Sequence, residues 1–385
     1  MKIKSIRNIK KFDNKKVILR LDLNVALSDG KITNDFKIRA SLETISFLLK
    51  RKAKILILSH LGRPTKENKA DYSLKPVAKY LKELLGQPVT LVSDLKEAKE
   101  SNWRDSNVMI LENLRFFKEE TENSASFAKK LANLANIYVN DAFAVSHRSH
   151  VSVDKIKNYL PSYAGFLLEK EVENLNKILK PKKPLLVIMG GSKISSKVPL
   201  IKNLEKKSDQ ILIAGALANT FLYFLGYEIG KSVYEKESKK DISPFIVKKK
   251  LNKKLILPID LLVKTRDNKA LIRSIDKVRK TDMILDIGPD TIIDFCQRIK
   301  KAKTIVWNGP LGMFEDKRFK HGTITIAIMI ASSSSSFSVI GGGETLAAAA
   351  ETKMSSYINW LSTGGGAMLS YLGKEEMPGL NKIIK

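Results

Sequence analysis

The stretch VIMGGSKISSK, residues 187–197, joins a strand-like apolar run to a glycine turn and two lysines. Gly190 and Gly191 end the run, and Lys193 and Lys197 follow four residues apart. Glycines after a strand let the main chain approach a ligand closely. We predict that the two lysines lie in the first turn of a helix, where cations are disfavoured unless an anion neutralises them. The stretch therefore predicts a phosphate site behind a strand.

Apolar runs of the same kind recur along the chain at intervals suited to strand–helix units. Most are continuous rather than alternating, which is typical of strands buried on both faces of a parallel sheet. A helix pattern over 73–86, closed by Gly86, is one of those between them. The expected strands are 17–25, 54–60, 108–113, 137–143, 185–191, 211–217, 255–263, 283–289, 304–310 and 337–344. The pattern predicts an α/β protein.

Length and composition exclude several classes of protein. The chain has 385 residues, which indicates two or three domains, and its 43% hydrophobic content supports packed cores. Cys296 is the single cysteine, so no internal disulfide forms, which favours the reducing cytoplasm. There is no secretory signal and no apolar stretch of membrane-spanning length. We therefore expect a soluble, cytoplasmic protein with no membrane contact.

The formal net charge of +28 is the strongest compositional signal. Such a charge suits a nucleic-acid binder, which stays open as an alternative function. However, the lysines are spread along the chain, in runs such as 179–186 and 247–255, and no nucleic-acid-binding motif accompanies them. We interpret the charge as a lysine-rich solvated surface and expect no nucleic-acid partner.

The residues that follow the expected strands differ between the two halves of the chain. In open α/β sheets, ligands bind beyond the carboxyl ends of the strands. The first half predicts a small, strongly anionic ligand held by side-chain cations, and the second predicts a nucleotide held by close main-chain approach. Glycine turns fill these places in the second half, whereas the first half carries His60, Arg63, Arg115, His147 and Arg148.

Polar side chains punctuate the first expected strand, RLDLNVAL at 20–27. Arg20, Asp22 and Asn24 are two residues apart, so we expect them on one face of the strand. Asp22 and Asn24 are suited to bind hydroxyl and carboxylate groups, although a half-exposed strand gives the same pattern. In SHLGRPTK (59–66), a sharp turn at Gly62 projects neighbouring cations from a strand end.

Two other patterns are weaker. His147 and His150 stand three apart, but no carboxylate or cysteine joins them at useful spacing, so we do not expect a metal there. GYEIGKSV (226–233) is similar to a phosphate-binding P-loop but lacks one residue between its glycines, which favours an ordinary turn.

Glycine-rich turns complete the second half at 307–315, 341–347 and 362–367. Glu344 is suited to reach a metal ion held by phosphates, and Thr345 to donate to a phosphate at a helix start.

Together these motifs resemble the phosphoglycerate kinase family over essentially the whole chain. The motifs that carry the resemblance are RLDLNV, SHLGRPTK, LENLRF, NDAF with SHR, GGSKISSK, WNGPLGMFE, GGGET and STGGGA. The resemblance implies a monomeric glycolytic enzyme that transfers a phosphoryl group between 1,3-bisphosphoglycerate and Mg-ADP, giving 3-phosphoglycerate and Mg-ATP. It also implies two Rossmann-like domains around a deep cleft.

The resemblance implies domain limits and residue roles as well. Residues 1–165 with 370–385 would form the phosphoglycerate-binding domain, 166–183 a hinge helix and 184–369 the nucleotide-binding domain. Lys37, Lys193 and Lys197 would be catalytic, and Glu344 would bind Mg²⁺. The implied substrate-binding residues are Asp22, Leu23, Asn24, Lys37, His60, Leu61, Gly62, Arg63, Arg115 and Arg148. The implied nucleotide-binding residues are Lys197, Asn308, Glu315, Gly342, Gly343, Glu344 and Thr345.

The chain departs from the family pattern at four of these motifs. Lys37 stands where the family has an arginine that bridges to the moving phosphoryl group, and lysine lacks the planar fork. Glu344 replaces the metal-binding aspartate, and Ala26 and Ala144 replace a proline and a glycine. Arg39 does not substitute for the missing arginine, because positions two apart face different sides of a helix. We expect an active enzyme that is slower than its relatives; a degraded relative kept as a scaffold is the alternative.

Overall fold

The computed structural model describes residues 3–100, 103, 106–247 and 250–384. Their contacts divide the chain into two compact units. The first unit comprises Met1–Glu173 and Glu376–Lys385, and the second comprises Asn174–Glu375. The chain leaves the first unit inside helix α6 (Phe166–Leu179) and re-enters it at Glu376.

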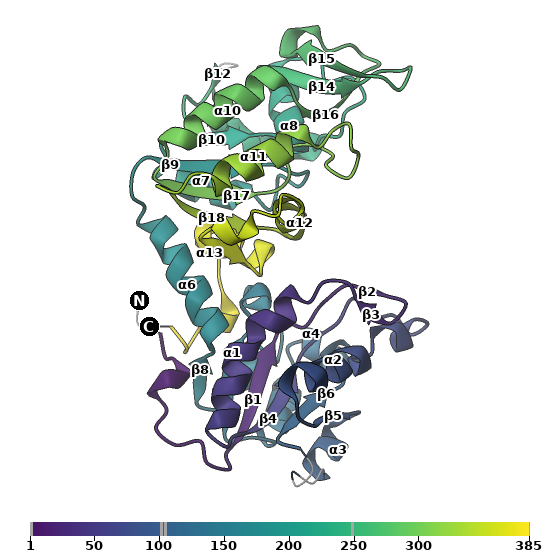
Figure 1. Cartoon of the computed structure of the whole chain (residues 1–385), viewed down its shortest axis with the longest axis vertical. Coiled ribbons are helices and arrows are strands. Elements are labelled where there is room, and N and C mark those ends of the chain that lie inside the picture. Colours follow the sequence, from purple (N-terminus) through teal and green to yellow (C-terminus); the bar gives the residue numbers. More distant parts are fainter. Residues whose placement is uncertain (1–2, 101–102, 104–105, 248–249, 385) are drawn as a thin grey trace. The chain divides into compact units, whose positions relative to one another are not determined.

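The first unit is built on a six-stranded sheet in which every neighbouring pair is parallel. Continuous apolar runs make its central strands, because both faces of such a sheet are covered. Figure 1 shows α1 lying along β1 and β4. The strands in spatial order are β5 (Val89–Val92), β6 (Val108–Leu111), β4 (Lys54–Leu58), β1 (Lys16–Leu21), β7 (Ile137–Asp141) and β8 (Ser162–Ala164).

Amphipathic helices cover this sheet. Ile38, Ile45 and Leu48 of α1 and Val77 and Leu81 of α2 belong to one buried cluster with the strands. Pro76 opens α2 and the left-handed Gly86 ends it, as the sequence pattern predicted. The helices of this unit are α1 (Phe36–Lys50), α2 (Lys75–Leu85), α3 (Leu95–Glu100), α4 (Lys118–Thr121), α5 (Ala125–Ala132) and the first part of α6. A small hairpin pairs β2 (Leu27–Ser28) with β3 (Lys31–Ile32).

The second unit repeats this plan with another six-stranded parallel sheet. Its strands in spatial order are β13 (Leu255–Ile256), β10 (Gln210–Ile213), β9 (Leu185–Met189), β17 (Thr304–Asn308), β18 (Phe337–Gly341) and β19 (Trp360–Ser362). Its helices are α7 (Val198–Glu205), α8 (Gly215–Leu225), α9 (Lys239–Ile242), α10 (Pro289–Lys301), α11 (His321–Ala331), α12 (Gly343–Glu351) and α13 (Gly365–Gly373). The predicted α/β class with helix-flanked parallel sheets is therefore confirmed.

Two predicted strands do not belong to the parallel sheet. The run 255–263 splits at Pro258, so that only β13 joins that sheet, and 283–289 supplies an antiparallel strand instead. A separate sheet orders β15 (Ala270–Ser274), β14 (Asp260–Lys264) and β16 (Met283–Ile287), and β11 (Ile246–Val247) pairs with β12 (Lys250–Leu251). The prediction of parallel strands was wrong here because a short turn joins β14 to β15, and strands joined in this way pair antiparallel. In that turn, the Thr265 amide donates to the Lys269 carbonyl at 2.9 Å.

The last residues of the chain complete the first unit. The Lys4 amide donates to the Ile383 carbonyl at 2.8 Å, and Ile3 pairs with Ile384. The buried ammonium of Lys157 donates to the carbonyls of Pro378 and Asn381. Figure 1 shows the yellow C-terminal segment ending beside the purple N-terminal one. Among the described residues, no helix has the length and apolarity that a membrane span requires.

The P-loop-like stretch 226–233 is a turn, as predicted. Gly226 ends α8 in the left-handed conformation, and Gly230 pairs with Met283 of the antiparallel sheet. Gly230 has φ +58°, and a Cβ there would overlap the Asp282 carbonyl. The glycine therefore serves main-chain packing and not phosphate binding.

We expect Gly230→Ala to lower the free energy of unfolding by at least about 2 kcal/mol, because it adds left-handed strain and a main-chain overlap. Urea denaturation measures this loss. Under conditions in which the variant is fully folded, its affinity for nucleotide should equal that of the natural chain. A selective loss of nucleotide binding without a loss of stability would instead indicate a phosphate-binding loop.

Candidate active site

The first candidate site is an open, cation-lined cavity of about 630 Å³ in the first unit. Its arginines come from three strands of one sheet: Arg63 follows β4, Arg115 lies after β6 and Arg148 follows β7. Because the carboxyl ends of parallel strands meet at one sheet edge, residues far apart in sequence converge there. The residues that line the cavity are Arg63, Pro64, Arg115, Thr121, His147, Arg148 and His150.

The three arginines repel one another. Burial, followed by Arg148 and Arg63, lowers the pKa of Arg115 to about 10, and burial also lowers the pKa of Arg148. Within the described part of the chain, none of the three forms an ion pair with a carboxylate. Arg115 and Arg148 are partly buried and Arg63 is exposed. Three guanidinium groups that face one cavity without an ion-paired carboxylate favour an anion, and their planar forks match phosphate and carboxylate.

A network of hydrogen bonds holds the loop that carries Arg63. The Gly62 amide donates to Oδ1 of Asn24 at 2.8 Å, and its carbonyl accepts from Arg115. Buried Asn113 exchanges hydrogen bonds with both main-chain groups of Leu61, at 3.2 and 2.7 Å. Gly62 has φ +56°, and a Cβ there would overlap the ring of Tyr72. Sequence reasoning identified Gly62 but missed the support that Asn113, in LENLRF, gives to it.

The prediction that Arg20, Asp22 and Asn24 share a strand face was wrong. β1 ends at Leu21, where its ladders with β4 and β7 end, and Asp22 and Asn24 lie in the following loop. Arg20 is buried, and its guanidinium contacts Nδ1 of His60 at 3.4 Å. The side chains of Leu23 and Leu61 belong to the core, which leaves only their main chain for a ligand.

The pKa of His60 and the pKa of Asp22 are both below their ordinary values at this edge, which favours a neutral imidazole and an ionised carboxylate. Burial lowers the pKa of His60 well below its ordinary value, although Asp22 acts in the other direction. The ring is therefore neutral at pH 7 and accepts from Arg20 at Nδ1, which leaves the proton on Nε2. Burial would raise the pKa of Asp22, but Lys37, His60 and Arg20 together lower it below the ordinary value.

Lys37 lies with the substrate-side residues, as the resemblance implied. Its ammonium donates to Oδ2 of Asp22 at 2.7 Å and to the Asn24 carbonyl at 3.3 Å. Arg39 points elsewhere, because its guanidinium pairs with Asp35 at 2.5 Å and contacts the Tyr80 hydroxyl at 3.2 Å. Arg39 therefore does not replace the missing arginine.

The histidines near this cavity have a carboxylate neighbour that sequence spacing did not indicate. Nδ1 of His150 lies 4.0 Å from Oε1 of buried Glu120. Burial, then Arg148, lowers the pKa of His150 to about 4, so the ring is neutral at pH 7. Among the described residues, no group of three or more histidine, cysteine, aspartate or glutamate side chains is arranged to hold a metal ion.

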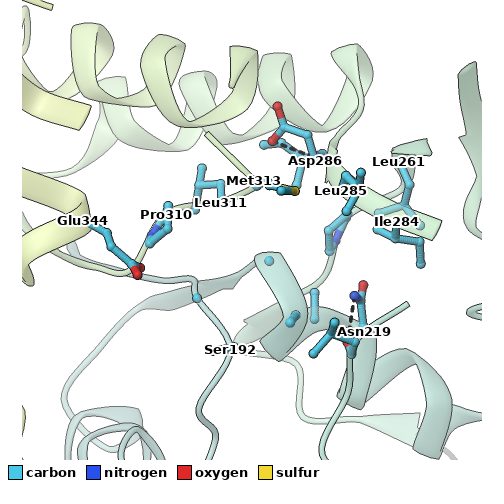
Figure 2. Close-up of a pocket in the computed structure, with 18 of the residues that line it drawn as sticks. Ser192, Asn219, Leu261, Ile284, Leu285, Asp286, Pro310, Leu311, Met313 and Glu344 are labelled. Atoms are coloured by element: carbon cyan, nitrogen blue, oxygen red, sulfur yellow. Dashed lines mark hydrogen bonds between the residues drawn. The ribbon is translucent and has the colours of Figure 1, made fainter. Parts of the chain in front are cut away.

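The second candidate site is a cavity of about 250 Å³ in the second unit, lined by glycines and apolar side chains (Figure 2). Gly191 and Ser192 follow β9, Gly215 opens α8, and Pro310–Met313 follow β17. Glu315 and Glu344 also line the cavity, and Figure 2 shows Glu344 beside Pro310. An apolar pocket with few polar groups, bordered by helix N-termini, suits a nucleotide base and its phosphates.

The two lysines of 187–197 precede the helix, so their predicted place in its first turn was wrong. α7 begins at Val198, and Lys197 is its N-cap residue, because residues 194–197 form a turn ahead of Pro199. The buried Lys197 ammonium reaches back to the Lys193 carbonyl at 3.3 Å. Burial lowers the pKa of Lys197, while Glu344 and Glu235 act in the opposite direction. Lys193 itself is exposed.

Main-chain contacts that leave no room for a side chain bring two turns together at one end of this site. A Cβ at Gly190 would overlap the Pro310 carbonyl, and one at Gly309, which has φ +91°, would overlap the Gly190 carbonyl. The Gly191 amide donates to the Pro310 carbonyl at 2.7 Å. These glycines bring the turns after β9 and β17 into direct contact.

The predicted nucleotide residues divide into exposed and structural ones. Gly343 is exposed at the start of α12, and Gly342 precedes it with φ +103°. Asn308 is buried and donates to the Gly341 carbonyl at 2.8 Å. Thr345 is also buried, and its hydroxyl accepts from the Gly309 amide at 2.8 Å, so it joins two phosphate-side turns.

Asp286, in the motif DIGP, lines the cavity and was missed by sequence reasoning. It is 2% exposed, and its carboxylate accepts from the amide of Gly322, near the start of α11, at 2.9 Å. A Cβ at Gly312 would overlap this carboxylate, so Asp286 supports the turn that borders the cavity. A buried aspartate inside an otherwise apolar run was the signal available in the sequence.

Burial raises the pKa of Asp286 from its ordinary value of 3.8 to about 7, against the amides of Gly322 and Ile287. The folded chain therefore binds this proton more tightly than the unfolded chain. The stabilisation is present in full below about pH 4 and is lost as pH rises toward 7. Asp286→Asn should abolish this contribution to the pH dependence of the unfolding free energy. Between about pH 4 and pH 7, the stability of the variant relative to the natural chain should therefore rise with pH by up to about 1.4 kcal/mol per pH unit.

Urea denaturation at pH 5 and pH 7, followed by tryptophan fluorescence, to which Trp307 and Trp360 of the same unit contribute, measures this difference. Equal pH slopes for the two proteins would show that Asp286 does not titrate in this range.

Comparison with known proteins finds relatives that match this chain over nearly its whole length. The sequence profile described as phosphoglycerate kinase matches residues 6–375. The phosphoglycerate kinase of Dictyoglomus turgidum is 45% identical, over 95% of this chain and 94% of its own. That of Borreliella burgdorferi is 44% identical over the full length of both. Among solved structures, the phosphoglycerate kinase of Coxiella burnetii is 38% identical with a TM-score of 0.83, covering 99% of both chains. That of Pyrococcus horikoshii is 32% identical with a TM-score of 0.84, covering 99% of this chain and 98% of its own.

Proposed function

This chain belongs to the phosphoglycerate kinase family, and we propose that its arginine-lined cavity holds the phosphoglycerate and its glycine-lined cavity the nucleotide. The chain is a phosphotransferase with a carboxyl group as acceptor. It transfers a phosphoryl group reversibly from 1,3-bisphosphoglycerate to ADP, giving 3-phosphoglycerate and ATP in glycolysis. The observation that carries the division of sites is the set of three arginines that form no ion pair with a carboxylate among the described residues.

Charge supports this assignment of the first site. Phosphoglycerate carries a phosphate and a carboxylate, which together give roughly three negative charges at pH 7. Arg63, Arg115 and Arg148 would pair with these groups, while neutral His60 and Asn24 would bind the remaining oxygens by hydrogen bonds. Anion binding would relieve the repulsion that, after burial, lowers the pKa of Arg115.

At the nucleotide site, the main chain would do most of the positioning. The amides at the starts of α8 and α12 lie beside the phosphate end, and Glu315 is placed on the cavity wall where a ribose hydroxyl would reach it. Lys193 and Lys197 would neutralise phosphate charge, and desolvation of Lys197 strengthens its attraction to an anion.

The residues present fit a Mg²⁺ ion that arrives with the nucleotide. Glu344 is one exposed carboxylate at the start of α12, and the described residues form no cage of three or more ligands. Mg²⁺ in kinases is held by one or two carboxylates together with substrate phosphates, so one carboxylate suffices. Bound there, the ion would offset charge on the phosphate oxygens, and Mn²⁺, which takes the same oxygen ligands, would serve in its place.

The reaction needs the acyl phosphate and the ADP oxygen in line, with water excluded. We propose that the two units close by bending at α6, the helix in which the chain passes from one unit to the other. Both sets of site residues come from one chain, which supports a monomer as the active form. The glycolytic reaction and the half-buried single Cys296 support a location in the cytoplasm.

A coupled assay of ATP formation from 1,3-bisphosphoglycerate and ADP, with Mg²⁺ and then Mn²⁺, tests the proposed function. We expect turnover with both metals. Arg148→Ala should raise KM for the bisphosphoglycerate by about tenfold or more, with KM for ADP unchanged. Absence of turnover with either metal would favour a scaffold role. Equal effects on both KM values would contradict the division of sites.

Lys37→Arg should raise kcat severalfold. The guanidinium restores a planar fork that can bond two phosphoryl oxygens, and one extra charge-assisted hydrogen bond of about 1 kcal/mol corresponds to roughly fivefold. Lys50→Arg, at the exposed far end of the same helix, is the matched control. An unchanged or lower kcat in Lys37→Arg would show that Lys37 does not occupy the bridging position.

A further inference from the structure

Both segments through which the chain crosses between its units are fastened to the end of one strand. The first crossing lies in α6 and the second at Glu375–Glu376. β7 ends with Asn140 and Asp141, two fully buried residues. Asp141 holds the start of α6, and Asn140 holds the segment that returns after Glu376. The loop that follows β7 carries Arg148 of the anion site.

Asp141 and Thr44 together cap the first turn of α6. The Phe166 amide donates to the Thr44 hydroxyl at 3.0 Å, and the Leu168 amide donates to Oδ1 of Asp141 at 3.0 Å. Without such partners these amides would be unsatisfied, because the first turn of a helix has no internal acceptors. A Cβ at Gly165 would overlap the Asp141 carboxylate, so glycine at this place permits the cap.

The cap is kept at an electrostatic cost. Burial raises the pKa of Asp141 to about 7, although Thr44 and the amides of Leu168 and Leu167 act in the opposite direction. Its second oxygen, Oδ2, has no hydrogen-bond partner among the described residues. A buried carboxyl group with one unpaired oxygen lowers stability. Its presence therefore indicates a role other than stabilising the fold.

Asn140 makes the matching attachment for the returning segment. Its amide nitrogen donates to the Gly379 carbonyl at 3.0 Å and to the Ser146 hydroxyl at 3.2 Å, and its oxygen accepts from the Ala142 amide at 3.0 Å. The Gly379 amide in turn donates to the Ser146 carbonyl at 2.8 Å. Ser146 stands two residues before Arg148, so the returning segment is bonded directly to the anion-binding loop.

We propose that Asn140, Asp141 and Thr44 are positioning residues for phosphoryl transfer, which hold both interunit crossings in a fixed relation to the loop that carries Arg148. The inference rests on the proposed closure about α6. None of the three lines either cavity. Loosening them should leave each substrate bound in its own unit but lower the fraction of bound complexes in which the phosphoryl group and its acceptor are in line.

Thr44→Val is the first test, because valine keeps the shape of threonine and removes only the hydroxyl. Asp141→Asn and Asn140→Ala test the other two attachments. Each variant should lower kcat about fivefold or more, with the dissociation constants of 3-phosphoglycerate and of ADP, measured separately by calorimetry, within about twofold of the natural chain. Small-angle X-ray scattering should show a smaller compaction on adding 3-phosphoglycerate and Mg-ADP together, a pair that cannot react.

Asp260→Asn is the matched control for a buried helix-capping aspartate away from the crossings. Asp260 is 5% exposed and caps α10 through the amides of Asp290 and Thr291 at 3.1 and 2.8 Å. It should lose stability with a smaller effect on kcat and on compaction than Asp141→Asn.

The outcomes separate this inference from the proposed function. If the natural chain turns over and the three variants lose stability but keep kcat and compaction, the residues are structural only and the inference is wrong. Raised dissociation constants in step with lowered kcat would also overturn it, because the substrates would then no longer bind normally. Thr44→Val keeps the test decisive even if Asp141→Asn does not fold.

Discussion

Arg63, Arg115 and Arg148 repel one another, and the first unit must hold them together against this repulsion. Guanidinium groups placed together without carboxylates would separate unless the main chain held them. Here each follows a different strand of a rigid parallel sheet, and Asn113, Asn24 and Gly62 bond the loops to one another. The sheet therefore holds like charges close together. An anionic ligand would neutralise them, and the relief of their repulsion would favour its binding.

The second unit meets the same need, the binding of a highly charged ligand, with few side-chain cations. One end of its cavity is made of turns whose main chains touch, at Gly190, Gly309 and Pro310, and Gly215 at the start of α8 also lines the cavity. Lys197 is buried, so its charge acts at short range in a setting with little water. The contrast between the two units suits the ligands proposed for them. A small acid would be held mainly through its charged groups, whereas a nucleotide also has an apolar base.

Much of this organisation could be predicted from the sequence, because strand ends and glycine turns are local patterns. The α/β class, the helix over 75–85 and the cations at the strand ends followed from apolar runs and the residues after them. What failed depended on contacts between distant segments. β14 and β16 have the same apolar composition as parallel strands, and only their pairing with β15 separates them. Asp22 lies beyond β1 because partner strands end there, and no local signal marks that point. Asn113, Asp286 and Asp141 bond to partners that are 52, 36 and 27 residues away in the sequence, and local spacing does not reveal such partners.

The attachment of residues 376–384 to the first unit has a consequence for how the protein is made. Lys4, Lys157 and Asn140 each bond to main-chain groups of this segment, so the unit that begins the chain also contains its last part. On the ribosome, the second unit is translated in full before these partners emerge. The first unit therefore cannot make these contacts, including the hydrogen bonds to the loop before Arg148, until residues 376–384 have followed the second unit.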